Sequence, residues 1–149
     1  MIPIGYFEND IYNYKILFGL LILIWSSDSW AFVCGNLFGR HKLSERISPN
    51  KTWEGFIGSI ILTTATGYVI SNNGFGLSQI EWMILGTLTA IFATLGDLFQ
   101  SMLKRESNIK DSGNILPGHG GILDRFDSIL LCFPVFYLYL YYINPILNY

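Results

Sequence analysis

The chain has 149 residues, of which 51% are apolar and only 13% charged, and its formal net charge is −2. The few charges are clustered and leave long uncharged runs, which is typical of a membrane protein and argues against a soluble domain. Both cysteines, Cys34 and Cys132, lie in apolar runs, so neither a disulfide framework nor a zinc site is expected. The N-terminal residues lack a basic stretch followed by an apolar core, so no cleavable signal peptide is expected.

Four apolar segments predict helices long enough to cross a membrane, which takes roughly 20 residues. The second is short and rich in threonine, and it reaches this length only by including residues 53–72. The fourth contains Pro134, which a membrane helix tolerates as a kink. The segments run from about Tyr14 to Phe38, Gly55 to Ile70, Ile80 to Phe99 and Ile129 to Leu147. We therefore predict an all-α fold, a polytopic membrane bundle of about four transmembrane helices, with residues 1–149 forming one membrane-embedded domain.

The basic residues predict the orientation of this bundle. Eight of the nine Lys and Arg residues lie in two loops, and the turn between the second and third segments carries no charge. Positively charged loops stay on the cytoplasmic side, so both basic loops are expected there, with both termini on the opposite side. The first loop contains Arg40, Lys42, Arg46 and Lys51, and the second contains Lys104, Arg105, Lys110 and Arg125.

Asp97 stands near the end of the third apolar segment. If the helix continues, Ser101, Lys104 and Arg105 follow at i+4, i+7 and i+8 on the same face. Cations that reach for water at a helix end would explain Lys104 and Arg105, but they would not explain Asp97. An acid inside an apolar run is costly and indicates a functional site.

Three further acids are candidate metal ligands. Asp124 and Asp127 share a face at the start of the fourth segment and, opposite Asp97, would form a cage for a hard divalent cation. The alternative is that they only stabilise the helix N-terminus. Asp28 is expected to be buried and to face the bundle. It is a metal ligand, a partner for a basic residue, or an end-of-helix residue if the first helix stops near Trp25.

Two polar stretches could contact phosphates. Glycines beside Lys110, Asp111 and His119 allow backbone N–H groups to approach phosphate oxygens, although the run matches neither a Walker loop nor a dinucleotide fingerprint. The stretch S-P-N-K-T-W-E-G from Ser48 to Gly55 is either a helix entry with Pro49 as the breaker or a second phosphate contact.

Residues 101–127 read S-M-L-K-R-E-S-N-I-K-D-S-G-N-I-L-P-G-H-G-G-I-L-D-R-F-D. This run resembles the signature of phosphatidate cytidylyltransferases, also called CDP-diglyceride synthetases. S-P-N-K-T-W-E-G and the D-S-W-A-F…G-N-L-F-G-R run are similar to that family as well. The resemblance extends from about Ile22 through Asp127 and the following helix, and it corresponds to the catalytic C-terminal part of longer family members.

The resemblance implies that CTP and phosphatidic acid react to give CDP-diacylglycerol and pyrophosphate. It implies Mg²⁺ as cofactor, with K⁺ as a candidate second ion, held by Asp97 and Asp124, with Asp127 and Asp28 as additional ligands. The implied catalytic residues are Lys104, Arg105, Lys110, Asp111, His119, Asp124, Arg125 and Asp127. The implied substrate contacts are Ser48, Lys51, Thr52, Ser101, Gly120 and Gly121.

The expected setting is a bacterial-type inner (plasma) membrane, with the active site facing the cytoplasm. The expected partners are CTP, phosphatidic acid, the lipid bilayer and a second copy of the chain, with no nucleic acid. Three other functions remain open. The chain is alternatively a CTP-dependent polyprenol or phytol kinase, a truncated non-catalytic membrane subunit, or a transporter with intramembrane acids.

Overall fold

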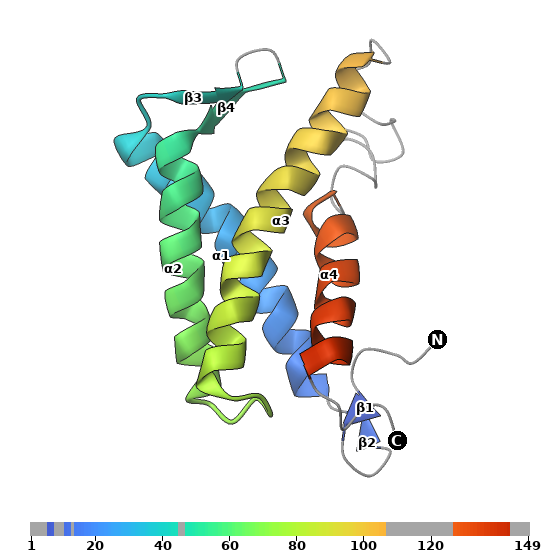
Figure 1. The fold of residues 1–149 in the computed structure, drawn as a ribbon. Helices are drawn as coiled ribbons and strands as arrows, with labels where there is room; N and C mark the ends of the chain where they lie inside the picture. Colours follow the sequence, from blue (N-terminus) through green and yellow to red (C-terminus); the bar gives the residue numbers. More distant parts are fainter. Residues whose placement is uncertain (1–5, 8–10, 13, 45–46, 107–126, 144–149) are drawn as a thin grey trace, which may run out of the picture.

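The computed structural model describes residues 6–7, 11–12, 14–44, 47–106 and 127–143. These residues form four helices and two short hairpins (Figure 1). The helices are α1 (Tyr14–Phe38), α2 (Trp53–Ser71), α3 (Gln79–Glu106) and α4 (Asp127–Ile143). The antiparallel strands β1 (Tyr6–Phe7) and β2 (Ile11–Tyr12) pair before α1, and β3 (Lys42–Ser44) and β4 (Ser48–Thr52) pair between α1 and α2.

The described helices pack as one bundle. The second helix contacts both α1 and α3, and α4 packs mainly on α3 (Figure 1). The hairpin β3–β4 and the C-terminal end of α3 lie at one end of this bundle, and the α2–α3 turn lies at the other. The two segments expected to be basic loops therefore begin at the same end of the molecule.

Most of the expected helical segments are confirmed. The first helix covers Tyr14–Phe38 and continues through Asp28, so it does not stop near Trp25. The third begins at Gln79 and ends at Glu106, which is longer than expected, and it carries Asp97, Ser101, Lys104 and Arg105 on one continuous helix. Within the part of the chain that is described, α1 and α3 are long and apolar enough to cross a membrane, while α4 is apolar but has only 17 residues.

The hairpins correct the expectation of a purely helical fold. In β3–β4, Lys42 pairs with Thr52 and Ser44 pairs with Ser48 across an irregular register. Apart from Leu43 both strands are polar, and both are too short for an alternation of apolar and polar residues to mark them in the sequence. Pro49 lies at a position of a two-stranded hairpin where a missing N–H donor is tolerated. The stretch around it is therefore a strand that leads directly into α2.

The helices α2 and α3 approach each other closely. A Cβ atom added at Gly86 would lie 2.7 Å from the carbonyl oxygen of Thr63, so only glycine fits there without moving a backbone. Lys51 precedes Thr63 by 12 residues and Asp97 follows Gly86 by 11. Because the two elements run antiparallel, this crossing brings Lys51 level with Asp97.

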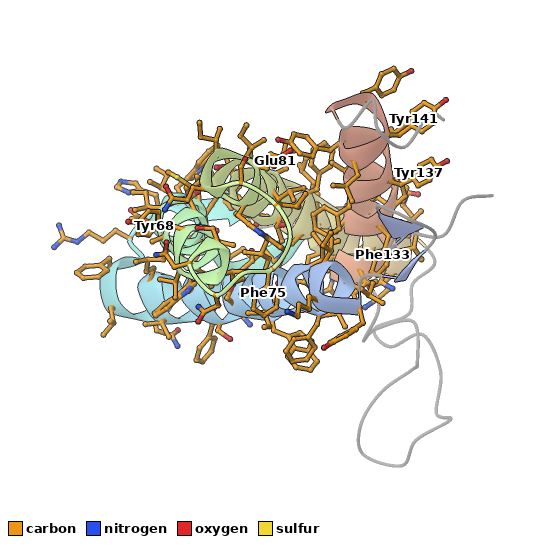
Figure 2. All side chains as sticks on the ribbon, turned by 90° about the horizontal axis from the view of Figure 1, so that it is seen from below. Tyr68, Phe75, Glu81, Phe133, Tyr137 and Tyr141 are labelled. Atoms are coloured by element: carbon orange, nitrogen blue, oxygen red, sulfur yellow. The ribbon has the colours of Figure 1, made fainter. Side chains whose placement is uncertain are left out.

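The core lies around Trp82, whose side chain has no exposed surface and whose ring packs against Gly19 of α1. The outer faces are also apolar: Ile61 and Val69 are 63% and 59% exposed. Figure 2 shows Tyr137 and Tyr141 on α4, and their rings stack with centroids 6.0 Å apart. An apolar exterior combined with a packed interior is what a bundle surrounded by lipid requires.

Candidate active site at the hairpin end of the bundle

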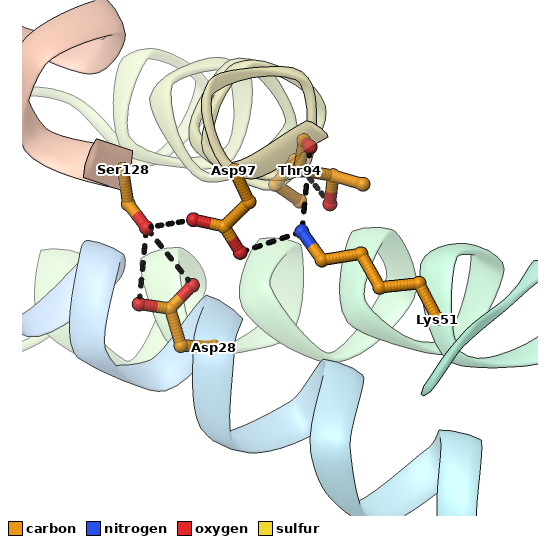
Figure 3. A network of polar contacts seen from close by, with 6 residues as sticks. Asp28, Lys51, Thr94, Asp97 and Ser128 are labelled. Atoms are coloured by element: carbon orange, nitrogen blue, oxygen red, sulfur yellow. Dashed lines mark hydrogen bonds and ion pairs between the residues drawn. The ribbon is translucent and has the colours of Figure 1, made fainter. Parts of the chain in front are cut away.

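A charge pair lies at the centre of the candidate site. The Lys51 ammonium is 2.5 Å from Asp97 Oδ2, and it also donates to the Thr94 carbonyl oxygen at 3.5 Å (Figure 3). Only 25% of the Lys51 side chain and 26% of the Asp97 side chain are exposed. Partial burial weakens solvent screening, so this pair interacts more strongly than a surface salt bridge of the same length.

Ser128 connects Asp97 to a second carboxylate. Its hydroxyl lies 3.0 Å from Asp97 Oδ1 and 3.4 Å and 3.5 Å from the two carboxylate oxygens of Asp28 (Figure 3). A hydroxyl has one proton, so at any moment it donates to only one of the two carboxylates. The two acids come from α1 and α3, and the negative potential between them favours a cation.

The N-terminus of α2 fixes the position of Lys51. Thr52 caps the helix, and its hydroxyl accepts a hydrogen bond from the Gly55 N–H at 3.2 Å. A Cβ atom added at Gly55 would lie 2.8 Å from the carbonyl oxygen of Ala31, so α1 and α2 touch at this point. Lys51 precedes the cap by one residue, and its side chain reaches α3.

A second contact fastens the hairpin to α2. The His41 N–H donates to both carboxylate oxygens of Glu54 at 3.2 and 3.3 Å, and His41 Nδ1 lies 2.7 Å from Oε1. The Trp53 N–H donates to the His41 carbonyl oxygen at 3.0 Å. Glu54 precedes the apolar stretch 55–70. The hydrogen bond from the His41 side chain, with smaller contributions from backbone N–H groups, lowers the pKa of Glu54 to about 2. We call this set of contacts the His41–Glu54 clasp.

The charge pair opens onto a cavity of about 240 Å³. Its wall combines apolar side chains with carboxylates, an ammonium and hydroxyls, a mixture that suits a molecule with both a phosphate and a less polar part. The lining includes Asp28, Asp97, Ser48, Lys51 and Thr52 on the polar side, and Ala31, Phe32, Leu43 and Phe56 on the apolar side.

The structure brings together five of the residues predicted from sequence. Asp28, Ser48, Lys51, Thr52 and Asp97 all line this cavity. The expectation that Asp28 is buried is wrong: its side chain is exposed because it lies on the wall of an open cavity.

The remaining predicted residues fall into two groups. Ser101, Lys104 and Arg105 lie further along α3 and do not line this cavity. Lys110, Asp111, His119, Gly120, Gly121, Asp124 and Arg125 lie outside the described residues, and Asp127 begins α4 without a described side chain.

Two contributors to the site were not predicted from the sequence. Ser128 follows Asp127 at the start of a helix, where a serine ordinarily indicates a cap. The Thr94 carbonyl has no signature in the sequence at all, because every residue has a carbonyl group. Spacing offers one signal for Thr94: it precedes Asp97 by three residues, so both lie on the same face of α3.

The donor atoms fit a hard divalent cation. Carboxylate, hydroxyl and carbonyl oxygens are the ligands that Mg²⁺ prefers, and Mg²⁺ commonly uses only one or two protein carboxylates together with substrate phosphates. Asp28 and Asp97 supply two carboxylates. Across the described ranges, no group of three or more His, Cys, Asp or Glu side chains is placed to hold a metal.

The chain belongs to the cytidylyltransferase family, whose sequence profile matches residues 3–143. It is similar to the phosphatidate cytidylyltransferase of Bacillus subtilis, with 43% identity over 132 residues that cover 88% of this chain and 49% of that protein. The Haemophilus influenzae enzyme of the same name is 40% identical over 142 residues, covering 92% of this chain and 49% of that protein. The Rickettsia bellii enzyme is 43% identical over 144 residues, which cover 92% of this chain and 60% of that protein. The resemblance predicted from the motifs is thus confirmed, and the chain spans about half the length of the curated relatives it matches.

Proposed function

We propose that residues 1–149 form the catalytic part of a phosphatidate cytidylyltransferase. The observation that carries this proposal is the pair of carboxylates, Asp28 and Asp97, held together by Ser128 and facing Lys51 at a cavity, in a chain of the cytidylyltransferase family. Oxygen ligands for a cation beside a lysine suit a reaction in which one phosphate group attacks another, because both groups carry negative charge that must be neutralised.

In the proposed reaction, a phosphate oxygen of phosphatidic acid attacks the α-phosphorus of CTP. The bond from the α-phosphorus to the oxygen bridging to the β-phosphate breaks, and pyrophosphate leaves with that electron pair. The attacking phosphate is already ionised near neutral pH, so little help from a general base is needed. Catalysis therefore rests on alignment and on neutralising charge.

The chain's own residues would divide these tasks. Asp28 and Asp97 would hold the metal, and the Ser128 hydroxyl would orient both carboxylates. Lys51 would contact a substrate phosphate from the cavity wall. When bound, Mg²⁺ would supply the charge neutralisation of the nucleotide phosphates. K⁺ remains the candidate for a second ion.

The proposed setting is a bacterial-type inner membrane that all four helices cross, with α2 spanning by drawing on residues 53–72. The length and apolar composition of α1 and α3, together with the exposed apolar side chains, support this arrangement. The site would then face the cytoplasm, where CTP is available, while the acyl chains of phosphatidic acid stay among lipids. A second copy of the chain is a proposed partner on the family resemblance alone.

Pyrophosphate release by the purified 149-residue chain in detergent, with CTP, phosphatidic acid and Mg²⁺, tests the proposal. Release that depends on phosphatidic acid and stops with EDTA is the expected result. A folded chain that releases no pyrophosphate would contradict the proposal that these residues suffice. Release of CDP together with a phosphorylated lipid alcohol would instead favour the CTP-dependent kinase.

A further inference from the structure

The contact between Lys51 and Asp97 connects a substrate-binding candidate directly to a metal-binding candidate. We propose that the Lys51 ammonium occupies the cation position at Asp97 and competes with a divalent cation for this carboxylate. This inference rests on the proposed function only in that the competing cation is the Mg²⁺ of nucleotidyl transfer.

The geometry requires an exchange. Both oxygens of Asp97 are engaged, Oδ1 by the Ser128 hydroxyl at 3.0 Å and Oδ2 by the Lys51 ammonium at 2.5 Å. A magnesium ion binds a carboxylate oxygen at about 2.0–2.1 Å. An ammonium and a divalent cation on the same oxygen would repel each other at close range, so metal binding at Oδ2 displaces Lys51.

Lys51 is able to move. Among the described residues, its only other polar contact is the long hydrogen bond to the Thr94 carbonyl at 3.5 Å, and its flexible four-carbon stem leads from β4. The side chain lines the cavity of about 240 Å³, so a displaced ammonium has room on the wall where an anionic phosphate would enter.

This arrangement makes cation binding and phosphate binding cooperative. A substrate phosphate that attracts Lys51 leaves Asp97 free for the cation, and a cation on Asp97 leaves Lys51 free for the phosphate. By linkage, each ligand then strengthens the other by the same factor. In the unloaded site, Lys51 also compensates the charge of a half-buried carboxylate that would otherwise be costly.

The decisive measurement is the affinity of the purified full chain for Mn²⁺ in detergent, without CTP or lipid substrate. Electron paramagnetic resonance reports the fraction of Mn²⁺ that is bound. Lys51→Met should bind Mn²⁺ about fivefold more tightly or better than the unaltered chain, within the usual range of such couplings. Lys51→Arg, which keeps the charge, should bind like the unaltered chain. Lys15→Met is the matched control, because it removes the same charge 13 residues before Asp28 on α1, and it should change nothing.

A second background separates direct competition from a general change of charge. Asp97→Asn lacks the shared carboxylate. Adding Lys51→Met to this variant should therefore leave its Mn²⁺ affinity unchanged. In the unaltered chain, acylation of Lys51 by an amine-reactive ester, located by mass spectrometry, should become faster when Mg²⁺ is added.

The proposal is overturned if Lys51→Met binds Mn²⁺ no more tightly than the unaltered chain, including the case in which neither binds. Equal tightening in the Asp97→Asn background would overturn it as well. None of these readouts needs turnover. A chain that releases pyrophosphate without this competition refutes only the inference, whereas competition without pyrophosphate release refutes only the proposed function.

Discussion

Ser128 is a small residue with a large role in the geometry of the site. Its side chain is buried, and its hydroxyl lies between the carboxylates of Asp28 and Asp97. Without it, two acids would face each other with one hydrogen-bond donor fewer. A group that orients metal-binding carboxylates in this way affects metal affinity nearly as much as some ligands do.

Ser128→Ala should therefore lower Mg²⁺-dependent pyrophosphate release by about 10-fold to 100-fold. The reason is that both carboxylates lose their common donor and move apart. A magnesium titration of the rate should show that the midpoint shifts to higher concentration. Ser71→Ala, which removes an exposed hydroxyl at the end of α2, is the control and should leave the titration unchanged.

Asp97→Asn should have the larger effect, a loss of at least about 100-fold in the same assay, because it removes a proposed metal ligand rather than the residue that orients it. A neutral amide keeps the shape of the side chain but weakens both the charge pair with Lys51 and the attraction for a cation. Full Mg²⁺-dependent turnover in this variant would contradict the metal assignment.

Among single residues, the acids of the site could be predicted from the sequence, whereas the serine that orients them could not. Asp28 and Asp97 could be predicted because a carboxylate inside an apolar run is costly without a purpose. The exposure of Asp28 could not, since it depends on a cavity formed together with four other elements, β3, β4, α2 and α3. Ser128 was missed because a serine at a helix start has an ordinary explanation.

Among the elements, the hairpin β3–β4 carries the most functional candidates for its size. Ser48, Lys51 and Thr52 all belong to β4, and the His41–Glu54 clasp ties the start of the hairpin, just before β3, to the start of α2. The helices were predictable from apolar length alone. The hairpin was not, because it is polar, short and held by pairing partners that no local pattern reveals.

The clasp predicts a response to acid. Because the pKa of Glu54 is lowered in the folded chain from its usual 4.5 to about 2, the clasp stabilises the hairpin above about pH 4.5, and this contribution is lost as the pH falls towards 2. Glu54→Gln should remove it at every pH. Hydrogen exchange of the His41 and Trp53 amides, each corrected for intrinsic rate, should be faster in Glu54→Gln at neutral pH.

The two proteins should then converge upon acidification, since the unaltered chain loses the same carboxylate charge. Glu81→Gln is the matched control, because Glu81 accepts the Ser78 N–H at 2.7 Å at the opposite end of the bundle. It should leave the hairpin amides unaffected. Equal exchange of these amides in Glu54→Gln and the unaltered chain at neutral pH would refute the role of the clasp.

The close crossing of α2 and α3 predicts that a larger side chain at Gly86 lowers the stability of the fold. Gly86→Val places a branched side chain against the Thr63 backbone, and the helices must separate. Overpacking of this kind typically costs about 1–3 kcal/mol. Thermal unfolding in detergent should show a lower midpoint for Gly86→Val, whereas Met83→Val, at an exposed position one turn earlier, should unfold close to the unaltered chain.

For the whole molecule, orientation is the property that charge predicts most directly. The hairpin and the C-terminal end of α3 lie at one end of the bundle, and the uncharged α2–α3 turn lies at the other (Figure 1). This separation follows from antiparallel packing of consecutive helices, which the short turn already indicated. The sequence could not show which helix contacts which, because that depends on small residues at particular crossings.

Cysteine labelling in inner-membrane vesicles of known orientation should report this topology. Asn73→Cys in the α2–α3 turn should react from the periplasmic side, and Arg40→Cys beside the hairpin only from the cytoplasmic side. The native Cys34 and Cys132 are buried, so labelling of the unaltered chain gives the background signal. Labelling of Arg40→Cys from the periplasmic side would invert the proposed orientation.

The cluster around Asp97 draws its members from almost the whole described chain: Asp28 and Ser128 are 100 residues apart. A ribosome making this protein therefore delivers the two acids and Lys51 long before the hydroxyl that connects them. Until α4 has been translated and has docked, the nascent chain has a half-built polar centre with no serine between its carboxylates. The polar centre of the described chain is therefore completed only after α4 has been translated and has packed against α3.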